Sequence, residues 1–192
     1  MAESSLIFIS GGVRSGKSSF AEKLAADYAQ EIDGQLHYIA AGQSSDPEME
    51  ERIRRHQNDR YESGLNWTTW EQPVGLSKLR NTFQYKDIVL LDCLTTLLNN
   101  EFFSMDEMWK SPDFQKQVMA SIMEGIEQIA QKCHHFIIVS NEVVYEPLGD
   151  RELVYIYGKM LAQLHQNIVA KANQAFLVEA GIPLLMKGTE KA

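Results

Sequence analysis

The chain has 192 residues, of which 44% are hydrophobic and 23% are charged, and its formal net charge is −8. This composition predicts one soluble globular domain over residues 1–192 with a full hydrophobic core. The acidic balance argues against nonspecific binding to nucleic acid, which needs a basic surface. The first residues lack the basic region of a signal peptide, and no apolar stretch reaches the ~20 residues of a membrane span, so we expect a cytoplasmic protein.

Short apolar runs alternate along the chain with longer helical patterns. Consecutive apolar residues indicate strands that are buried on both faces, as in a parallel sheet covered by helices. The predicted strands are Leu6–Ser10, Leu36–Ala40, Ile88–Asp92, Phe136–Ser140 and Ala175–Glu179, with an edge strand at Ile182–Lys187. The predicted helices are Ser18–Gln30, Pro47–Arg60, Asp113–Lys132 and Arg151–Asn173. This order predicts a doubly wound, mostly parallel α/β sheet that binds ligands at the carboxyl ends of its strands.

A glycine-rich loop follows the first predicted strand. Gly11 is followed by four residues and then by Gly16, Lys17 and Ser18, which is the spacing of a Walker A phosphate-binding loop. In such a loop, the backbone N–H groups and the following helix face phosphate, the lysine reaches the β- and γ-phosphates, and the serine hydroxyl binds Mg²⁺. The flanking strand and helix disfavour a chance match. Arg14 is either a further cation for phosphate or a solvated loop arginine.

Asp92 ends the predicted strand Ile88–Asp92, as the acidic residue of a Walker B strand does. Many strands end in aspartate, but together with the glycine loop the pattern predicts that Asp92 holds Mg²⁺ or its water shell. These two motifs make the predicted fold a P-loop NTPase type. We expect Thr95 and Thr96 to cap the next helix.

The stretch Glu51–Arg60 places His56 among arginines. Glutamate and arginine residues four apart would form ion pairs along this helix, and a solvated, salt-bridged helix with a structural histidine is one interpretation. Met49, Ile53, His56 and Arg60 share one helical face, however, so His56 follows the apolar stripe. Neighbouring arginines would keep its imidazole neutral and attract phosphate, which makes phosphate chemistry at His56 the other interpretation.

The remaining candidate groups are interpreted as structural. Cys93 and Cys133 are far apart and lie beside apolar runs, which indicates reduced, buried thiols. The other histidines lack metal-ligand spacing, and these are His37, His134, His135 and His165. The aromatic stretch Glu101–Trp109 suits either a lid or a contact between subunits, and the sequence leaves this open.

Taken together, these stretches resemble the family of bifunctional adenosylcobinamide kinase and adenosylcobinamide-phosphate guanylyltransferase enzymes of cobalamin biosynthesis. The resemblance runs nearly end to end, through the segments GGVRSGKS, YIAAGQ, DPEMEERIRRH, WTTWEQP, LLDCLTTLLNN, VSNEV and AGIPLLMKG. The glycine loop is generic. The DPEMEERIRRH helix together with the WTTWEQP segment is specific to the family.

The resemblance implies a reaction in two steps. A nucleoside triphosphate, ATP or GTP, first phosphorylates adenosylcobinamide, and GMP from GTP then passes through an enzyme histidine to give adenosylcobinamide-GDP. The guanylylated histidine of the family falls on His56, and Lys17 serves the phosphates. The nucleotide-binding positions implied in this way are Gly11, Gly12, Val13, Arg14, Ser15, Gly16, Lys17, Ser18, Ala41, Gly42, Gln43, Arg60, Glu71 and Asp92. The resemblance also implies Mg²⁺ at Ser18 and Asp92, and a homotrimer with active sites between subunits.

One region departs from the family pattern. Loop glycines of the family are replaced by Val144 and Glu146, and an arginine and an aspartate before His165-Gln166 are missing. We interpret this region as a subunit or corrinoid contact. Two alternatives therefore remain at this stage: another P-loop small-molecule kinase, or a nucleotide-binding member that has lost one or both activities.

Overall fold

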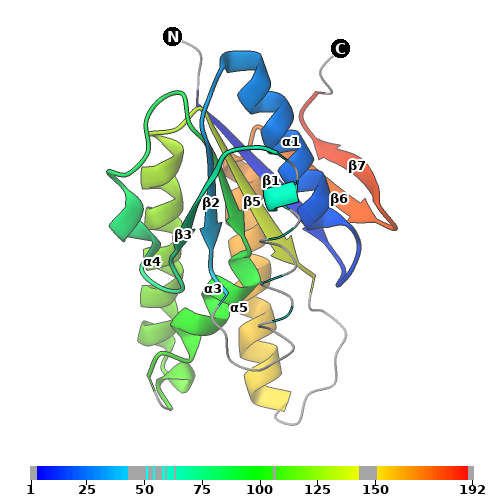
Figure 1. The fold of residues 1–192 in the computed structure, drawn as a ribbon. Helices are drawn as coiled ribbons and strands as arrows, with labels where there is room; N and C mark the ends of the chain where they lie inside the picture. Colours follow the sequence, from blue (N-terminus) through cyan, green and yellow to red (C-terminus); the bar gives the residue numbers. More distant parts are fainter. Residues whose placement is uncertain are drawn as a thin grey trace.

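The computed structural model describes residues 4–42, 51, 54, 58, 60–62, 64–105, 107–142 and 151–189 (Figure 1). Among these residues, seven strands form one sheet in the order β3-β2-β4-β5-β1-β6-β7. The strands are β1 (Ser5–Gly11), β2 (Leu36–Ala40), β3 (Trp67–Glu71), β4 (Ile88–Asp92), β5 (His135–Asn141), β6 (Gln174–Glu179) and β7 (Ile182–Lys187). Six of them pair in parallel, and β7 is antiparallel to β6.

Helices cover both faces of this sheet, as Figure 1 shows. The α-helices that lie wholly within the described ranges are α1 (Lys17–Ile32), α3 (Leu94–Phe102), α4 (Pro112–Ala130) and α5 (Arg151–Lys171), and two short 3-10 helices are η1 (Leu76–Leu79) and η2 (Met108–Lys110). Helix α4 begins after Ser111, whose hydroxyl accepts a hydrogen bond from the Phe114 N–H, with Pro112 at the first helical position. None of the helices in the described ranges is both long and apolar enough to cross a membrane.

Alternate residues of the central strands enter two separate hydrophobic cores. Ile88 and Leu90 of β4 pack in the core beneath α1, whereas Val89 and Leu91 pack in the larger core beneath α3, α4 and α5. This alternation follows from the period of two in a strand. It also fixes the direction of the residue that ends β4, because Asp92 must lie on the α1 face.

The predicted strands and the α/β class are confirmed. β2, β4 and β7 have the predicted bounds, and β1, β5 and β6 extend by one or two residues beyond them. Strand β3 was not predicted as a strand. It pairs only with β2 and is largely exposed, so it carries no continuous apolar run. The predicted helix Pro47–Arg60 lies mostly outside the described residues, although Glu51, Arg54, Asn58 and Arg60 of it are helical.

Two smaller predictions have opposite outcomes. The expectation that Thr95 and Thr96 cap the next helix is wrong, because α3 begins at Leu94 and Cys93 occupies the cap position, where its side chain makes no capping hydrogen bond. Thr95 instead turns its hydroxyl toward β5, as described below. The expectation of free, buried cysteines is confirmed for Cys93 and Cys133. Burial raises the pKa of the Cys133 thiol to about 12.

Candidate functional site

The loop between β1 and α1 forms a compact phosphate cradle. The Ser15 N–H donates to the Gly12 carbonyl at 3.2 Å, and the Lys17 ammonium donates to the same carbonyl at 2.9 Å. A Cβ at Gly11 would lie 2.5 Å from the Val178 carbonyl oxygen, so no larger residue fits there. Gly16 has a φ of 91°, which favours glycine. The sequence therefore places glycines where this loop shape requires them.

The side chains of the loop are arranged for an anion. Lys17 is only 4% exposed and lies in the first turn of α1, while Ser18 is half-buried beside it. Val13 and Arg14 are exposed at the tip of the loop. The first N–H groups of α1 and the positive end of its dipole face the same loop, which is a general anion-binding arrangement.

The turn between β6 and β7 packs against this loop from the side. The Gly181 N–H donates to the Ser15 carbonyl at 2.8 Å, and a Cβ on Gly16 would lie 3.1 Å from the Gly181 Cα. The phosphate loop is thus joined to the last hairpin of the sheet as well as to β1 and α1.

Acidic residues lie along the same edge of the sheet. Ala40, at the end of β2, is in register with Glu71 at the end of β3 and with Asp92 at the end of β4. Asp92 is half-buried and Glu71 is exposed. Parallel strands end at one edge, so the two carboxylates and the phosphate loop share the carboxyl edge of the sheet.

The segment after β2 contributes backbone to this edge. Ala41 is fully buried, its N–H donates to the Asp92 carbonyl at 3.3 Å, and Gly42 is half-buried. The Asn100 amide donates to the carbonyls of Ala41 at 2.9 Å and Pro73 at 3.0 Å, which ties together the loops that follow β2 and β3. Ala41 can therefore offer a ligand little beyond its backbone.

Tyr38 links the Walker B aspartate to the arginine-rich segment. Its hydroxyl donates to Asp92 Oδ2 at 3.1 Å. The Arg60 guanidinium lies 3.6 Å from the centre of the Tyr38 ring, and Arg60 Nη1 is 3.5 Å from Glu22 Oε1 of α1. Arg60 is 5% exposed, so the inward face expected for Arg60 is confirmed.

Asn141 adds an amide between the phosphate loop and the strand end that carries Asp92, because β5 lies between β1 and β4. It ends β5, in register with Gly11 of the phosphate loop, and its Nδ2 lies 3.8 Å from Cys93 Sγ. Its Oδ1 is buried and has no hydrogen-bond partner within the described part of the chain. Val139, two residues earlier, belongs to the core beneath α1, so alternation directs Asn141 to the face of α1.

A polar network holds the end of β5 from the opposite face. Thr95 Oγ1 accepts from the Asn141 N–H at 2.8 Å and lies 3.0 Å from Ser140 Oγ, which in turn lies 2.8 Å from His165 Nε2 of α5. The Tyr157 hydroxyl donates to the Thr95 carbonyl at 2.9 Å. Burial lowers the pKa of His165 to about 4, so its imidazole is neutral near pH 7.

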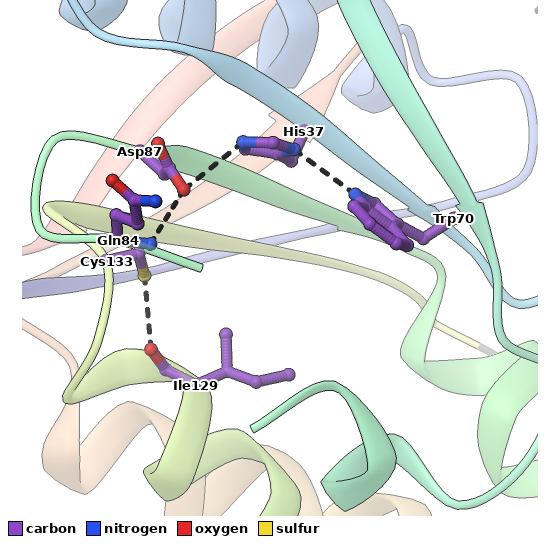
Figure 2. Close-up of polar contacts among 6 residues, drawn as sticks. All are labelled: His37, Trp70, Gln84, Asp87, Ile129 and Cys133. Carbon is purple, nitrogen blue, oxygen red and sulfur yellow. Dashed lines mark hydrogen bonds and ion pairs between the residues drawn. The ribbon is translucent and has the colours of Figure 1, made fainter. Parts of the chain in front are cut away.

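Figure 2 shows a second cluster, whose residue types would also suit catalysis. His37 Nε2 lies 3.2 Å from Asp87 Oδ2, and Trp70 Nε1 donates to His37 Nδ1 at 3.2 Å. The Cys133 thiol donates to the Ile129 carbonyl at 3.3 Å. Both ring nitrogens of His37 are engaged and the thiol stays protonated, so this cluster is structural, in agreement with the prediction for His37.

The structure brings most of the predicted site residues to the carboxyl edge. These are the loop Gly11–Ser18, Ala41, Gly42, Glu71 and Asp92, with Arg60 behind Asp92. His56 and Gln43 lie outside the described residues. Sequence reasoning did not single out Tyr38 or Asn141. Their signal was weak but present, because each lies near the carboxyl end of a predicted strand, at a position that alternation places beside α1.

Comparison with known proteins decides the family. The model of the family "Cobinamide kinase / cobinamide phosphate guanyltransferase" matches residues 7–186. The chain belongs to this family.

Two curated relatives agree along nearly their whole length. The bifunctional adenosylcobalamin biosynthesis protein CobU of Escherichia coli (strain K12) is 30% identical over 189 residues, which cover 95% of this chain and 99% of the relative. The bifunctional adenosylcobalamin biosynthesis protein CobP of Pseudomonas aeruginosa (strain PAO1) is 33% identical over 183 residues, covering 94% of this chain and 96% of the relative.

A solved structure supports the fold. The flagellar accessory protein FlaH from Methanocaldococcus jannaschii superposes with a TM-score of 0.53 at 17% identity, covering 100% of this chain and 84% of that one. At this identity the likeness concerns the fold alone. The predicted P-loop NTPase-type fold is confirmed.

Proposed function

We propose that this chain phosphorylates adenosylcobinamide with a nucleoside triphosphate and then transfers GMP from GTP to the product, which gives adenosylcobinamide-GDP. Family membership supports this reaction pair. The single structural observation that carries the proposal is the formed phosphate loop, with Lys17 buried in it, at the sheet edge that also holds Asp92. We assign both activities to one domain over residues 1–192.

In the phosphorylation step, the corrinoid hydroxyl oxygen attacks the γ-phosphorus of the nucleotide. The bond from this phosphorus to the β,γ-bridging oxygen breaks, the nucleoside diphosphate leaves, and the hydroxyl proton is released. Backbone N–H groups of Gly11–Ser18, including those of Gly12, Val13 and Gly16, hold the phosphates. Lys17 stabilises the charge that develops on them, and Arg14 can add a second cation from the loop tip.

The residues present fit a magnesium ion. Mg²⁺ prefers one or two carboxylates and hydroxyls together with substrate phosphates, rather than a cage made only by protein. Ser18 and Asp92 supply such oxygens, and Asn141, in register with Gly11, has a buried Oδ1 without a hydrogen-bond partner among the described residues. When bound, the ion would neutralise charge on the β- and γ-phosphates. Asp92 and Ser18 would hold it and orient the nucleotide.

In the second step, His56 serves as the nucleophile. A ring nitrogen of His56 attacks the α-phosphorus of GTP, and the bond to pyrophosphate breaks. A phosphate oxygen of adenosylcobinamide phosphate then attacks the same phosphorus and the N–P bond breaks, which restores the histidine. We place Ala41, Gly42, Gln43, Arg60 and Glu71 around this nucleotide. The register between Ala40 and Glu71 supports this grouping, because it brings Glu71 next to the segment that begins at Ala41.

We further propose that the enzyme is a cytoplasmic homotrimer whose subunits meet near the corrinoid. Exposed apolar side chains on the segment after α3 support a contact surface there, namely Phe103, Met105 and Met108. The divergent region around Val144 and Glu146 is the proposed subunit or corrinoid contact, and it lies outside the described residues.

Labelling with α-³²P-GTP tests the guanylyl step. We expect acid-labile, alkali-stable label on the protein that is lost in His56→Ala, while phosphorylation of adenosylcobinamide remains measurable in that variant. Complete absence of label on the unmodified chain would contradict the guanylyl transfer and would favour the alternative of a P-loop small-molecule kinase. Tight nucleotide binding without either product would indicate a member that has lost turnover, and loss of both activities in His56→Ala would contradict separate roles.

A further inference from the structure

The first observation concerns how Asp92 is held. Tyr38 and Asp92 lie on neighbouring parallel strands, both on the face of α1, and Tyr38 donates its hydroxyl to Asp92 Oδ2 at 3.1 Å. Tyr38 is 5% exposed. Hydrogen bonds to a charged carboxylate are among the stronger ones in proteins, so this contact fixes the direction of one carboxylate oxygen.

The second observation concerns what lies on the other side of the Tyr38 ring. The Arg60 guanidinium covers the ring at 3.6 Å, and Glu22 of α1 lies 3.5 Å from it. An arginine over an aromatic face is attracted by the ring's π-electrons, more strongly when both are shielded from water. Arg60 is helical, as are Glu51, Arg54 and Asn58, the described residues that precede it in the same stretch of the chain.

We propose that Tyr38 is a positioning residue that couples Arg60 to the carboxylate of Asp92. The inference rests on the proposed function, because it assumes that Asp92 serves the metal. It adds a control of the metal-binding acid: its orientation depends on the Tyr38 hydroxyl, and the placement of Tyr38 depends on the Arg60 guanidinium that covers its ring.

The arrangement gives Arg60 a second role besides its proposed place near the nucleotide, and the two roles predict different effects of its removal. Arg60 is 5% exposed, and its guanidinium is engaged by the Tyr38 ring and Glu22. Removing a direct nucleotide ligand would change nucleotide affinity first. Removing a coupling residue would change the magnesium requirement at saturating nucleotide, in the phosphorylation step that does not use His56.

Tyr38→Phe tests the hydroxyl, since it keeps the ring and removes only the donor to Asp92. We expect the Mg²⁺ concentration for half-maximal phosphorylation to rise about tenfold at saturating nucleotide, the size expected for a lost hydrogen bond to a charged group. Tyr28→Phe is the matched control. Tyr28 lies in the same core, and its hydroxyl donates to Gln174 at 3.0 Å, away from Asp92. Its loss should leave the magnesium requirement unchanged.

Arg60→Gln and the double variant test the coupling. We expect Arg60→Gln to raise the magnesium requirement about threefold, in keeping with a cation–π contact shielded from water. In Tyr38→Phe the ring no longer reaches Asp92, so Arg60→Gln should add no further increase. Equal increases in both backgrounds, or none in either, would overturn the coupling.

Asp92→Asn separates failure of this inference from failure of the proposed function. If Asp92→Asn raises the magnesium requirement and Tyr38→Phe does not, the inference is overturned and the metal role of Asp92 stands. If Asp92→Asn leaves the requirement unchanged, the proposed metal role itself fails. Thermal unfolding of each variant shows whether the chain is folded, and a lower melting temperature with an unchanged magnesium requirement in Tyr38→Phe would assign Tyr38 a structural role only.

Discussion

His37 and Tyr38 are adjacent on β2, yet they point to opposite faces of the sheet and take part in two different kinds of polar cluster. Each contacts an aspartate at one end of β4: His37 lies 3.2 Å from Asp87, which precedes the strand, and Tyr38 donates to Asp92, which ends it. The two clusters contain similar ingredients, namely an aromatic or imidazole ring, a carboxylate and a neighbouring aromatic or cationic group.

The clusters differ in how much hydrogen-bonding capacity is left for a ligand. His37 is engaged at both ring nitrogens, and the Asp87 oxygen that meets it also accepts from the Gln84 N–H at 2.7 Å. At the opposite edge, Asp92 is half-buried beside the phosphate loop, and the buried Oδ1 of Asn141 has no partner in the described ranges. The residue types alone do not distinguish a ligand-binding site from a structural cluster. The distinction comes from whether the polar atoms already have hydrogen-bond partners within the protein.

The largest expected effect is at Lys17. Lys17→Ala removes the cation of the phosphate loop, and loss of one such electrostatic group costs about a hundredfold to a thousandfold in rate. We expect both phosphorylation and guanylyl transfer to fall, measured as kcat/KM for the nucleotide. Unfolding by heat serves as the control. Full activity in Lys17→Ala would show that the carboxyl edge is not the nucleotide site.

A pair of substitutions at the two ends of β4 sharpens the contrast. Asp87→Ala leaves the buried His37 ring and the part-buried Gln84 N–H without their partner, so we expect a loss of about 2 kcal/mol in the free energy of unfolding. The KM for nucleotide should stay unchanged. Asp92→Asn should do the reverse, with lower activity and little change in denaturant unfolding. Similar effects of both variants on activity would remove the distinction between the clusters.

The last effect is expected from the pH dependence of His165. Its pKa is about 4 in the folded chain and 6.5 ordinarily, so below pH 6.5 the unfolded chain binds the proton first. Stability therefore falls as the pH drops from 6.5 toward 4, by about 2 kcal/mol between pH 7 and pH 5 from this group. His165→Gln keeps a partner for Ser140 and should reduce that loss, measured by denaturant unfolding at both pH values. An unchanged pH dependence would contradict the role of His165.

Much of the fold could be predicted because its strands are buried on both faces. The runs that form β1, β2, β4 and β5 are almost entirely apolar, which identified them as buried strands. The glycine loop indicated that β1 is followed directly by helix α1. Strand β3 escaped prediction because an edge strand needs only one neighbour, and Thr68, Thr69 and Glu71 face solvent. Its five residues, WTTWE, show neither a continuous apolar run nor alternation between apolar and polar residues, so they carry too little pattern to identify a strand.

The local motifs of the site were predictable, and its long-range contacts were not. The spacing around Lys17 and the end of the strand at Asp92 can be read along the chain. The hydrogen bond between Tyr38 and Asp92 depends on which strands are neighbours in the sheet. The Thr95 hydroxyl accepts from the N–H of Asn141, 46 residues away in sequence, and does not cap the helix beside it. Tertiary partners thus replaced the local cap that the propensity of threonine suggested.

The hydrogen bond from the Gly181 N–H to the Ser15 carbonyl has a consequence for how tightly nucleotide can bind. A flexible phosphate loop must lose conformational entropy when a ligand arrives, and that loss weakens binding. Here the hairpin of β6 and β7 holds the phosphate loop once the chain has folded. The loop therefore loses much of its conformational entropy during folding and not when the nucleotide binds. The antiparallel turn between β6 and β7 therefore favours nucleotide binding by holding the phosphate loop in place.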